Sequence, residues 1–490
     1  MENYMIGIDQ STQGTKSLLF NGRGDLIARA DLPHRQIVNE KGWVEHAPEE
    51  LYANTIQTVK TVVEKAGIPQ KSIAGVGISN QRETALAWGM DGKPVCNAIV
   101  WQCARGQQIC ERIAQAGEMV KAKTGLPLSP YFSAAKIAWI LENIEGAMEM
   151  AKRGRLCYGT VDSYLVYRLT GRKVYQTDYS NASRTQLFNI RTLVWDEEIC
   201  EKFGVPVKNL PKVTDSDGCY GETDFEGFLE HKVPICGVLG DSHGALFGQG
   251  CIKEGMIKAT YGTGSSVMMN VGEKPVFSEH GAVSSLAWGM GGKINYVLEG
   301  NINYTGAVIT WLEKELKLIA SAKETEKLAR EASLEDKAYL VPAFTGLGAP
   351  YWDSRAAGIL CGITRTTGQK EVVRAALDCI AYQITDIIKV MAQDSGVKIQ
   401  ELRVDGGPTK NRYLMEFQSN VAGIPVQVPK AEELSGMGAA YAAGIGLGIY
   451  DREELFSRME RTAFVPCMSR EKAEEKYKGW KDAVNMVLGR

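Results

Sequence analysis

Two short loops of the chain contain residue types that bind phosphate groups. The first follows Asp9 and spans residues 10–15, with the sequence QSTQGT, and Lys16 comes directly after it. Backbone amides in such a turn point inward and the hydroxyls add donors, which makes a cradle for an anion. Lys16 could neutralise a phosphate oxygen, and Asp9 could hold Mg²⁺ through the waters of the ion. A polar hairpin with an Asx-type turn is the alternative that this loop alone leaves open.

The second loop spans residues 262–266, with the sequence GTGSS. Strand-like apolar runs flank both loops, at residues 4–9 and 16–20 for the first and at 257–261 and 267–270 for the second. Two such runs joined by a Gly/Ser/Thr turn are typical of a β-hairpin. Two similar loops about half a chain apart predict a duplicated two-domain protein with a cleft between its halves. Coincidence is the alternative, because Gly/Ser/Thr turns are common.

Asp241 is a third candidate, because it follows the strand-like run 233–239 and precedes small residues. In a cleft, its carboxylate would act as a general base toward an acceptor hydroxyl, or would orient that hydroxyl. The alternative for an aspartate in this position is a helix N-cap. His243 lies beside it, but we interpret this lone histidine as structural, since the histidines of the chain show no metal-ligand spacing.

The segment NQRET, residues 80–84, directly follows another strand-like run at 72–78. Arg82 and Glu83 could supply donors and acceptors to two neighbouring hydroxyls, and the alternative is an ordinary surface ion pair. ATP-dependent phosphotransfer needs groups that bind phosphate, a carboxylate that organises a metal ion and a group that accepts the proton of the attacking hydroxyl. The chain has no G-x-x-x-x-G-K-S/T motif and no protein-kinase motifs. The sequence therefore predicts transfer of the γ-phosphoryl group of ATP to a small polyol or sugar, with phosphate bound by the two loops.

Size and composition limit the remaining possibilities. At 490 residues the chain exceeds one ordinary hydrophobic core, so we expect two domains, at residues 1–245 and 246–490. Strand-like and helix-like runs alternate, as at 372–391 where a long helix is predicted, and this favours an α/β fold. With 56 Lys+Arg against 58 Asp+Glu there is no basic excess, so we expect no nucleic-acid partner.

The cysteines and the apolar stretches indicate the compartment. Eleven cysteines without a CxxC pair favour reduced thiols. The first residues lack the layout of a signal peptide, and the apolar stretch 438–450 is shorter than the ~20 residues that a bilayer requires. We therefore expect a cytoplasmic protein without a membrane partner.

Taken together and in order, the motifs resemble the FGGY family of carbohydrate kinases, and most closely its glycerol kinase branch. The similarity runs from residue 6 to about residue 480. The segments on which it depends are GWVEH at 42–46, NQRET at 80–84, NAIVWQC at 97–103, YFSAAKIAW at 131–139, NASRT at 181–185, PAFTGLGAPYW at 342–352, DGG at 405–407 and GAA at 438–440.

The resemblance implies a duplicated, actin-like and ribonuclease H-like two-domain fold whose lobes close on ATP, Mg²⁺ and the acceptor. Carried over by position, the residues that would meet the nucleotide phosphates are Thr12, Gln13, Gly14, Lys16 and Thr263. The rest of the nucleotide site would be lined by Gly306, Thr310, Gly407 and Asn411. The acceptor would contact Arg82, Glu83, Tyr131 and Asp241, with Asp241 as the base and Trp101 as an apolar wall. The resemblance also implies a homodimer or homotetramer, and glycerol as the first expected acceptor, converted to glycerol 3-phosphate.

Three departures from the glycerol kinase pattern concern the acceptor and the phosphates. Ser242 stands where those enzymes have a glutamine, and Ser266 where we expect a phenylalanine that packs against the carbon chain. Both changes favour a roomier and more polar pocket, suited to a C4–C5 polyol or ketose of the erythritol or pentulose type. The Arg82–Glu83 pair favours glycerol, so both acceptors stay open. Lys16 replaces the usual arginine, which keeps the charge but loses the bidentate fork.

A protein of this fold that is not a kinase is the remaining alternative. It would be an actin-like ATPase or a sugar-sensing binding protein. Such a protein is expected to lack the acceptor base or the Arg–Glu pair, and this chain has Asp241, Arg82 and Glu83.

Overall fold

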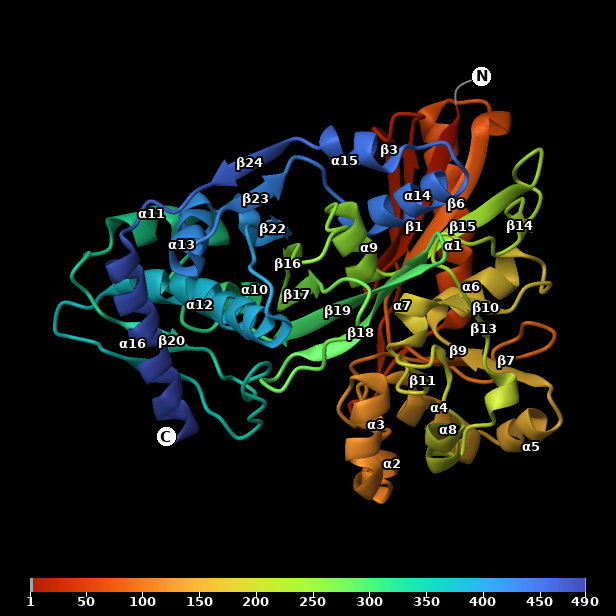
Figure 1. Cartoon of the computed structure of the whole chain (residues 1–490), viewed down its shortest axis with the longest axis horizontal. Coiled ribbons are helices and arrows are strands. Elements are labelled where there is room, and N and C mark those ends of the chain that lie inside the picture. The colour runs from red at the N-terminus through yellow and green to blue at the C-terminus, as the bar shows by residue number, and fades with distance from the viewer. Residues whose placement is uncertain (1–2, 490) are drawn as a thin grey trace.

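The computed structural model describes residues 3–489. Two mixed sheets, one from each half of the chain, form the frame of the molecule (Figure 1). The first sheet has the strand order β14 (Glu222–Thr223), β15 (Val233–Gly240), β6 (Ile73–Asn80), β1 (Tyr4–Gln10), β2 (Gly14–Phe20), β3 (Leu26–Pro33). The second sheet has the order β18 (Val283–Met290), β19 (Lys293–Ile302), β17 (Ser265–Asn270), β16 (Ile257–Tyr261), β22 (Leu402–Asp405), β23 (Val426–Pro429), β24 (Arg461–Phe464).

Both predicted hairpins are present, and they occupy equivalent places in the two sheets. β1 pairs antiparallel with β2, and β16 pairs antiparallel with β17. In the first sheet the hairpin has the antiparallel strand β3 on one side and the parallel strands β6 and β15 on the other. In the second sheet the hairpin has the antiparallel strand β19 on one side and the parallel strands β22 and β23 on the other. This repeated topology confirms the duplicated α/β fold that the two loops predict.

The register of the parallel strands determines where the site forms. Gln10 at the end of β1 is paired with Asn80 at the end of β6, and Asn80 is paired with Gly240 at the end of β15. The three strands therefore end at one edge of the first sheet. In open α/β sheets, ligands bind beyond the carboxyl ends of the strands. The chain continues there with the first hairpin loop, with Gln81-Arg82-Glu83 and with Asp241.

Two helices pack between the sheets. α9 (Asp241–Gly248) contacts β16 and β17 of the second sheet, whereas α14 (Leu434–Gly446), from late in the chain, contacts β1, β6 and β15 of the first. Figure 1 shows α14, in blue, beside the red and orange strands of the first sheet. Small residues allow this approach, because a Cβ on Gly438 would lie 1.9 Å from the carbonyl oxygen of Gly244 in α9. The predicted boundary at residue 245 would pass through α9, and it stays a prediction.

The remaining elements surround this frame. Helices of the first half are α1 (Pro48–Ala66), α2 (Gln107–Arg112), α3 (Gly117–Thr124), α4 (Ser133–Asn143), α5 (Ala147–Lys152), α6 (Val161–Leu169), α7 (Tyr179–Ala182) and α8 (Glu197–Phe203). Those of the second half are α10 (Gly306–Lys314), α11 (Thr325–Glu331), α12 (Gln369–Ser395), α13 (Arg412–Ala422), α15 (Arg452–Ser457) and α16 (Arg470–Leu488). Short strands are β4 (Ile37–Val38), β5 (Val44–His46), β7 (Leu86–Gly89), β8 (Ala98–Ile99), β9 (Leu156–Gly159), β10 (Gln176–Asp178), β11 (Phe188–Asn189), β12 (Val194–Trp195), β13 (Lys212–Thr214), β20 (Tyr339–Val341) and β21 (Ile359–Cys361).

The hydrophobic cores follow the sheets. One large cluster surrounds the second sheet and α12, which extends the predicted helix at 372–391 at both ends. A further cluster joins the two halves through α9 and α14, with Met5, Leu246, Met268 and Ala440 among its members. Within residues 3–489, no helix is both long enough and apolar enough to cross a membrane.

Candidate active site

The first hairpin places Asp9 at the edge of the first sheet. Asp9 is the register partner of Lys16 across the hairpin, and the loop closes through hydrogen bonds from the Ser11 amide and hydroxyl to the Gly14 carbonyl. The Asp9 side chain is buried, and the Ser79 hydroxyl donates to it at 3.2 Å. Burial raises the pKa of the Asp9 carboxyl to about 7; Lys16 opposes this shift, and the nearby carboxylate of Asp241 adds to it. A cation beside Asp9 would therefore stabilise the ionised form of its carboxyl group.

Lys16 faces a carboxylate of the second half of the chain. Its Nζ donates to Glu433 at 2.6 Å, and Arg29 donates to the other oxygen of Glu433 at 2.5 Å. Asp9 and Lys16 line a cleft of about 580 Å³ together with Thr260 and Gly407 of the second half. The cleft therefore lies between the first hairpin and the second half of the chain, and no residue of the second loop, 262–266, is on its wall.

A second cavity, of about 440 Å³, lies beside this cleft and shares Gly407 with it. All four residues predicted to line the rest of the nucleotide site are on its wall: Gly306, Thr310, Gly407 and Asn411. Apolar side chains that include Ile309, Leu377 and Ile380 complete that wall. A mainly apolar pocket with a few fixed polar groups is suited to a nucleoside.

Local backbone contacts shape this cavity. Gly306 opens α10, and its amide donates to the Gly262 carbonyl of the second loop, while the Thr305 amide donates to Thr263. Asn411 caps α13, because its side chain accepts the Leu414 amide at 3.0 Å. Its Nδ2 donates to Thr325, also at 3.0 Å. The second loop and the cavity wall are therefore one connected structure.

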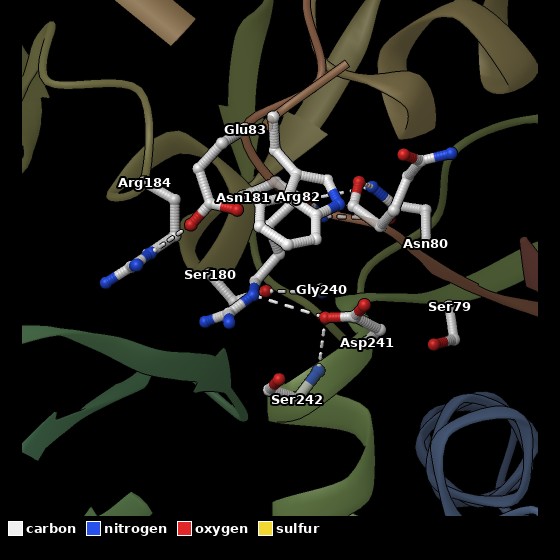
Figure 2. Close-up of polar contacts among 12 residues, drawn as sticks. Ser79, Asn80, Arg82, Glu83, Ser180, Asn181, Arg184, Gly240, Asp241 and Ser242 are labelled. Carbon is white, nitrogen blue, oxygen red and sulfur yellow. Dashed lines mark hydrogen bonds and ion pairs between the residues drawn. The ribbon is translucent and has the colours of Figure 1, made fainter. Parts of the chain in front are cut away.

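The Arg82 and Glu83 side chains do not pair with each other, although they are adjacent in sequence. Arg82 directs Nη1 and Nη2 to Glu299 at 2.9 and 2.8 Å and Nε to Asp241 at 3.2 Å. Glu83 accepts from Arg184 at 2.6 Å. Figure 2 shows these contacts between Arg82 and Asp241 and between Glu83 and Arg184. Both Arg82 and Glu83 are buried, so the alternative of an ordinary surface ion pair is wrong.

Asp241 is the first residue of α9, after the strand β15 ends at Gly240. It is not the N-cap, because that position belongs to Gly240. Its Oδ1 accepts the Ser242 amide at 2.6 Å, while a third of the side chain, 33%, remains exposed. Among the residues at the end of the first sheet, Asp241 thus combines a fixed orientation with access for a ligand.

Trp101 and Tyr131 form the aromatic part of the same region. Their ring centroids lie 5.5 Å apart, edge to face, and Trp101 Nε1 donates to the Thr12 hydroxyl at 2.9 Å. Burial raises the pKa of Tyr131, so its hydroxyl stays protonated. Lys136 of α4, which is fully buried, donates to the backbone carbonyls of Tyr131 and Phe132 and fixes the turn that presents Tyr131.

The two serines that depart from the expected pattern have different surroundings. Ser242 is half-buried on α9 next to Asp241. Ser266 is the second residue of β17. Its register partner on β19 is Asn301, and the register partner of Met268 is Glu299. Because alternate residues share a face, Ser266 lies on the same face as Glu299. Its hydroxyl is buried without a hydrogen-bond partner among residues 3–489.

His243 is fully buried, and neither ring nitrogen has a partner within the described part of the chain. Burial lowers the pKa of His243 well below its usual value, and the neighbouring Arg82 acts in the same direction. The ring is therefore neutral. Gln13 and Thr263, in contrast, are exposed at the tips of the two loops.

The donor set fits a magnesium ion that is held mainly by waters and phosphate oxygens. Residues 3–489 contain no cluster of three or more His, Cys, Asp or Glu side chains that could hold a metal. Mg²⁺ keeps several waters and is commonly bound through one or two carboxylates plus substrate phosphates. Asp9, which is buried and lines the cleft with Lys16, would supply one such carboxylate.

Several residues of the site were missed when the sequence was analysed residue by residue: Ser79, Lys136, Arg184, Glu299 and Glu433. Arg184 and Lys136 lie in segments that show the family resemblance, but nothing local indicates their role. Glu299 could have been noticed as a lone charge at the end of the apolar run 296–298.

Comparison with known proteins agrees with this geometry. The model of the FGGY family of carbohydrate kinases, N-terminal domain, matches residues 4–248, and that of the C-terminal domain matches residues 257–447. The chain belongs to this family. It is an ATP-dependent kinase with the family's actin-like two-domain fold, and it uses ATP with Mg²⁺.

Similar proteins span the whole chain. The glycerol kinase of Caldanaerobacter subterraneus subsp. tengcongensis is 46% identical over 493 residues, covering 100% of this chain and 99% of the relative. The glycerol kinase of Alkaliphilus oremlandii is 45% identical, covering 100% and 98%. Among solved structures, Plasmodium falciparum glycerol kinase with ADP superposes with a TM-score of 0.93 at 33% identity, covering 99% of this chain and 98% of that one.

Proposed function

We propose that this kinase transfers the γ-phosphoryl group of ATP to a hydroxyl of glycerol, giving glycerol 3-phosphate and ADP. The observation that supports this most is the meeting of Arg82, Glu83 and Asp241 at the ends of β6 and β15, beside the cleft that contains Asp9 and Lys16. Full-length relatives named glycerol kinase, at 45–46% identity, support the same acceptor.

Each acceptor-binding group has a distinct part. Arg82 donates to, and Glu83 accepts from, neighbouring hydroxyls of the polyol. Trp101 and Tyr131 cover its carbon chain. Asp241 accepts the proton of the attacking hydroxyl as the oxygen bonds to the γ-phosphorus and the bond to the β,γ-bridging oxygen breaks. The 33% exposure of its side chain leaves room for that hydroxyl.

The nucleotide groups hold the phosphoryl donor in line with this hydroxyl. Lys16, with the backbone and hydroxyl groups of Thr12, Gln13, Gly14 and Thr263, binds the phosphates. Gly306, Thr310, Gly407 and Asn411 hold the nucleoside in the cavity of about 440 Å³. Bound through waters near Asp9, Mg²⁺ would offset the negative charge of the phosphates. Catalysis then depends on positioning and on charge stabilisation by fixed groups.

A C4–C5 polyol or ketose is a second candidate acceptor. The Ser266 hydroxyl favours it, because this buried group has no partner within residues 3–489 and would gain one from an additional hydroxyl of the ligand. Ser242, which follows Asp241 on α9, offers another hydroxyl.

A coupled assay of ADP release across C3 to C6 polyols and ketoses, with and without Mg²⁺, tests the proposal. We expect release that requires an acceptor and Mg²⁺, with glycerol among the best acceptors. Release without any acceptor dependence would instead favour an actin-like ATPase, and absence of release with every acceptor would favour a binding protein. Preference for a four- or five-carbon acceptor over glycerol would favour the second candidate.

We further infer a cytoplasmic location, which the 11 free cysteines support, because reduced thiols persist in that compartment. A homodimer or homotetramer remains part of the proposal, and the mass of the assembly in solution tests it.

A further inference from the structure

Glu299 is a fully buried carboxylate of the second sheet that pairs with two arginines of the first half of the chain. It lies on β19, and both of its oxygens accept from Arg82, at 2.8 and 2.9 Å. Arg184 Nη1 lies 3.0 Å from one of the same oxygens. Although burial opposes ionisation, Arg184 and Arg82 together hold the pKa of Glu299 below its usual range, so it is a carboxylate.

These contacts form an alternating row of charges that ends at the two sides of the acceptor site. The row is Glu83, Arg184, Glu299, Arg82 and Asp241, with successive separations of 2.6, 3.0, 2.8 and 3.2 Å. Its two outer members are the acceptor-binding glutamate and the base. Glu299 is the central member, and it is the only one of the five that comes from the second sheet.

The geometry of the Glu299 pair restricts Arg82 in a way that one hydrogen bond would not. A guanidinium group that gives two parallel N–H bonds to a carboxylate has a fixed plane. With Nη1 and Nη2 directed to Glu299, Nε is the nitrogen that faces Asp241. Arg82 is only 6% exposed, so without its partner a buried charge would remain incompletely paired, and the side chain would move toward other oxygens.

The same carboxylate also influences Glu83. Arg184 is held between Glu83 and Glu299 and is 1% exposed, with few alternative partners for its charge. Glu83 itself has a left-handed backbone conformation, with φ of 61°, which an unbranched glutamate adopts only when its surroundings impose it. The side chain that accepts from the polyol is thus oriented through Arg184.

We propose that Glu299 is a positioning residue for the acceptor: from the second sheet it sets the orientation of Arg82 directly and of Glu83 through Arg184. The inference rests on the proposed function, in which Arg82 and Glu83 bind the acceptor. It follows that the acceptor site has its binding geometry only while the second sheet is docked against the ends of β6 and β15. Lys16, beside the first loop, does not belong to this row, since it pairs with Glu433 instead.

The test replaces Glu299 with glutamine, which keeps the size of the side chain and removes its charge. We expect Glu299→Gln to raise the KM for the acceptor by about 10- to 100-fold, as loss of a charged hydrogen bond does, while the KM for ATP stays within about twofold. Glu299→Asp, which keeps the charge, should recover part of the acceptor affinity. The matched control is Glu401→Gln, which removes a carboxylate that pairs with Arg403 at 2.8 Å in the same half of the chain, and it should leave both constants unchanged.

Arg184→Lys tests the same row of charges with a smaller change, since lysine keeps the positive charge but cannot contact Glu83 and Glu299 with two nitrogens at once. If Glu299→Gln does not fold, the acceptor KM of Arg184→Lys decides, with the same selective increase expected. An unchanged acceptor KM, or equal increases for acceptor and ATP as a general loss of structure would cause, would overturn the inference and leave the proposed function intact. A folded wild-type protein without acceptor-dependent ADP release would overturn the proposed function, and the inference with it.

Discussion

The indole nitrogen of Trp101 donates a hydrogen bond to the hydroxyl of Thr12 at 2.9 Å. Thr12 belongs to the first predicted phosphate loop, and Trp101 packs edge to face against Tyr131 in the predicted acceptor wall. The two substrates of the proposed reaction therefore meet protein groups that are bonded to each other. This contact links the loop to the wall, which suits a reaction that depends on in-line positioning.

Trp101→Phe removes this hydrogen bond and keeps an aromatic wall. Because the Thr12 hydroxyl loses its donor, we expect kcat to fall by about 3- to 10-fold, as for a neutral hydrogen bond. The KM for the acceptor should change less, since the apolar surface is retained. Steady-state kinetics with both substrates varied measure this. A larger effect on acceptor KM than on kcat would contradict the link between wall and loop.

Lys16 is expected to act on the nucleotide only. Lys16→Ala leaves Arg29 as the remaining cation on Glu433 and removes the charge that faces the phosphates. We predict a rise in the KM for ATP of about 10- to 100-fold, the usual effect of losing a charged hydrogen bond, with little change in acceptor KM. Lys16→Arg, which can form a fork with phosphate, should retain activity. Equal activity of the alanine variant would show that Lys16 serves only the pair with Glu433.

The Asp9 carboxylate should lower the stability of the folded protein at high pH, although the proposed reaction requires it. Because the folded-state pKa of Asp9, about 7, lies above the ordinary aspartate value of 3.8, the folded protein binds this proton more tightly than the unfolded chain does. The free energy of unfolding therefore falls as pH rises from about 4 to about 7. Without nucleotide or Mg²⁺, Asp9→Asn should therefore be more stable than the wild type at pH 8, by a few kcal/mol, and less so at pH 5. Thermal melting at both pH values measures the difference.

The same Asp9→Asn variant should lose most of its activity, since it lacks the carboxylate expected to face the hydrated metal ion. A stability gain that is identical at pH 5 and pH 8 would contradict the ionisation account, and wild-type activity would contradict the role near Mg²⁺.

Ser266 and Ser285 make a matched pair, because both hydroxyls are buried without a partner in the described chain. Ser266 belongs to the second loop predicted from sequence and lies on β17, whereas Ser285 lies on β18, separated from β17 by β19. Replacing either by alanine should stabilise the free protein slightly, since an unpaired buried hydroxyl costs about 1–3 kcal/mol. Only Ser266→Ala should raise the KM for a four-carbon polyol. Equal acceptor constants for the two variants would exclude Ser266 as a specificity residue.

Local pattern predicted the frame of this protein and the parts of the site attached to it. The hairpin around residues 10–15, the strand before Arg82 and the strand before Asp241 all follow from short apolar runs and the polar residues that end them. The partners of those residues do not follow in this way. Arg82 pairs with a residue 217 positions away, Glu83 with one 101 away and Lys16 with one 417 away. Such pairs depend on how the sheets dock, and no local spacing encodes that.

The most direct test of the account is acceptor-dependent ADP release with glycerol, ATP and Mg²⁺, measured side by side for the wild type and Asp241→Asn. The asparagine keeps the size of the side chain and cannot take the proton of the attacking hydroxyl, so kcat should fall by about 10²- to 10⁴-fold, the usual contribution of a general base. The melting temperature and the KM for ATP should stay near those of the wild type. Full activity of Asp241→Asn would contradict the assignment of the base, and a wild type that releases no ADP with glycerol or any other polyol would contradict phosphoryl transfer itself.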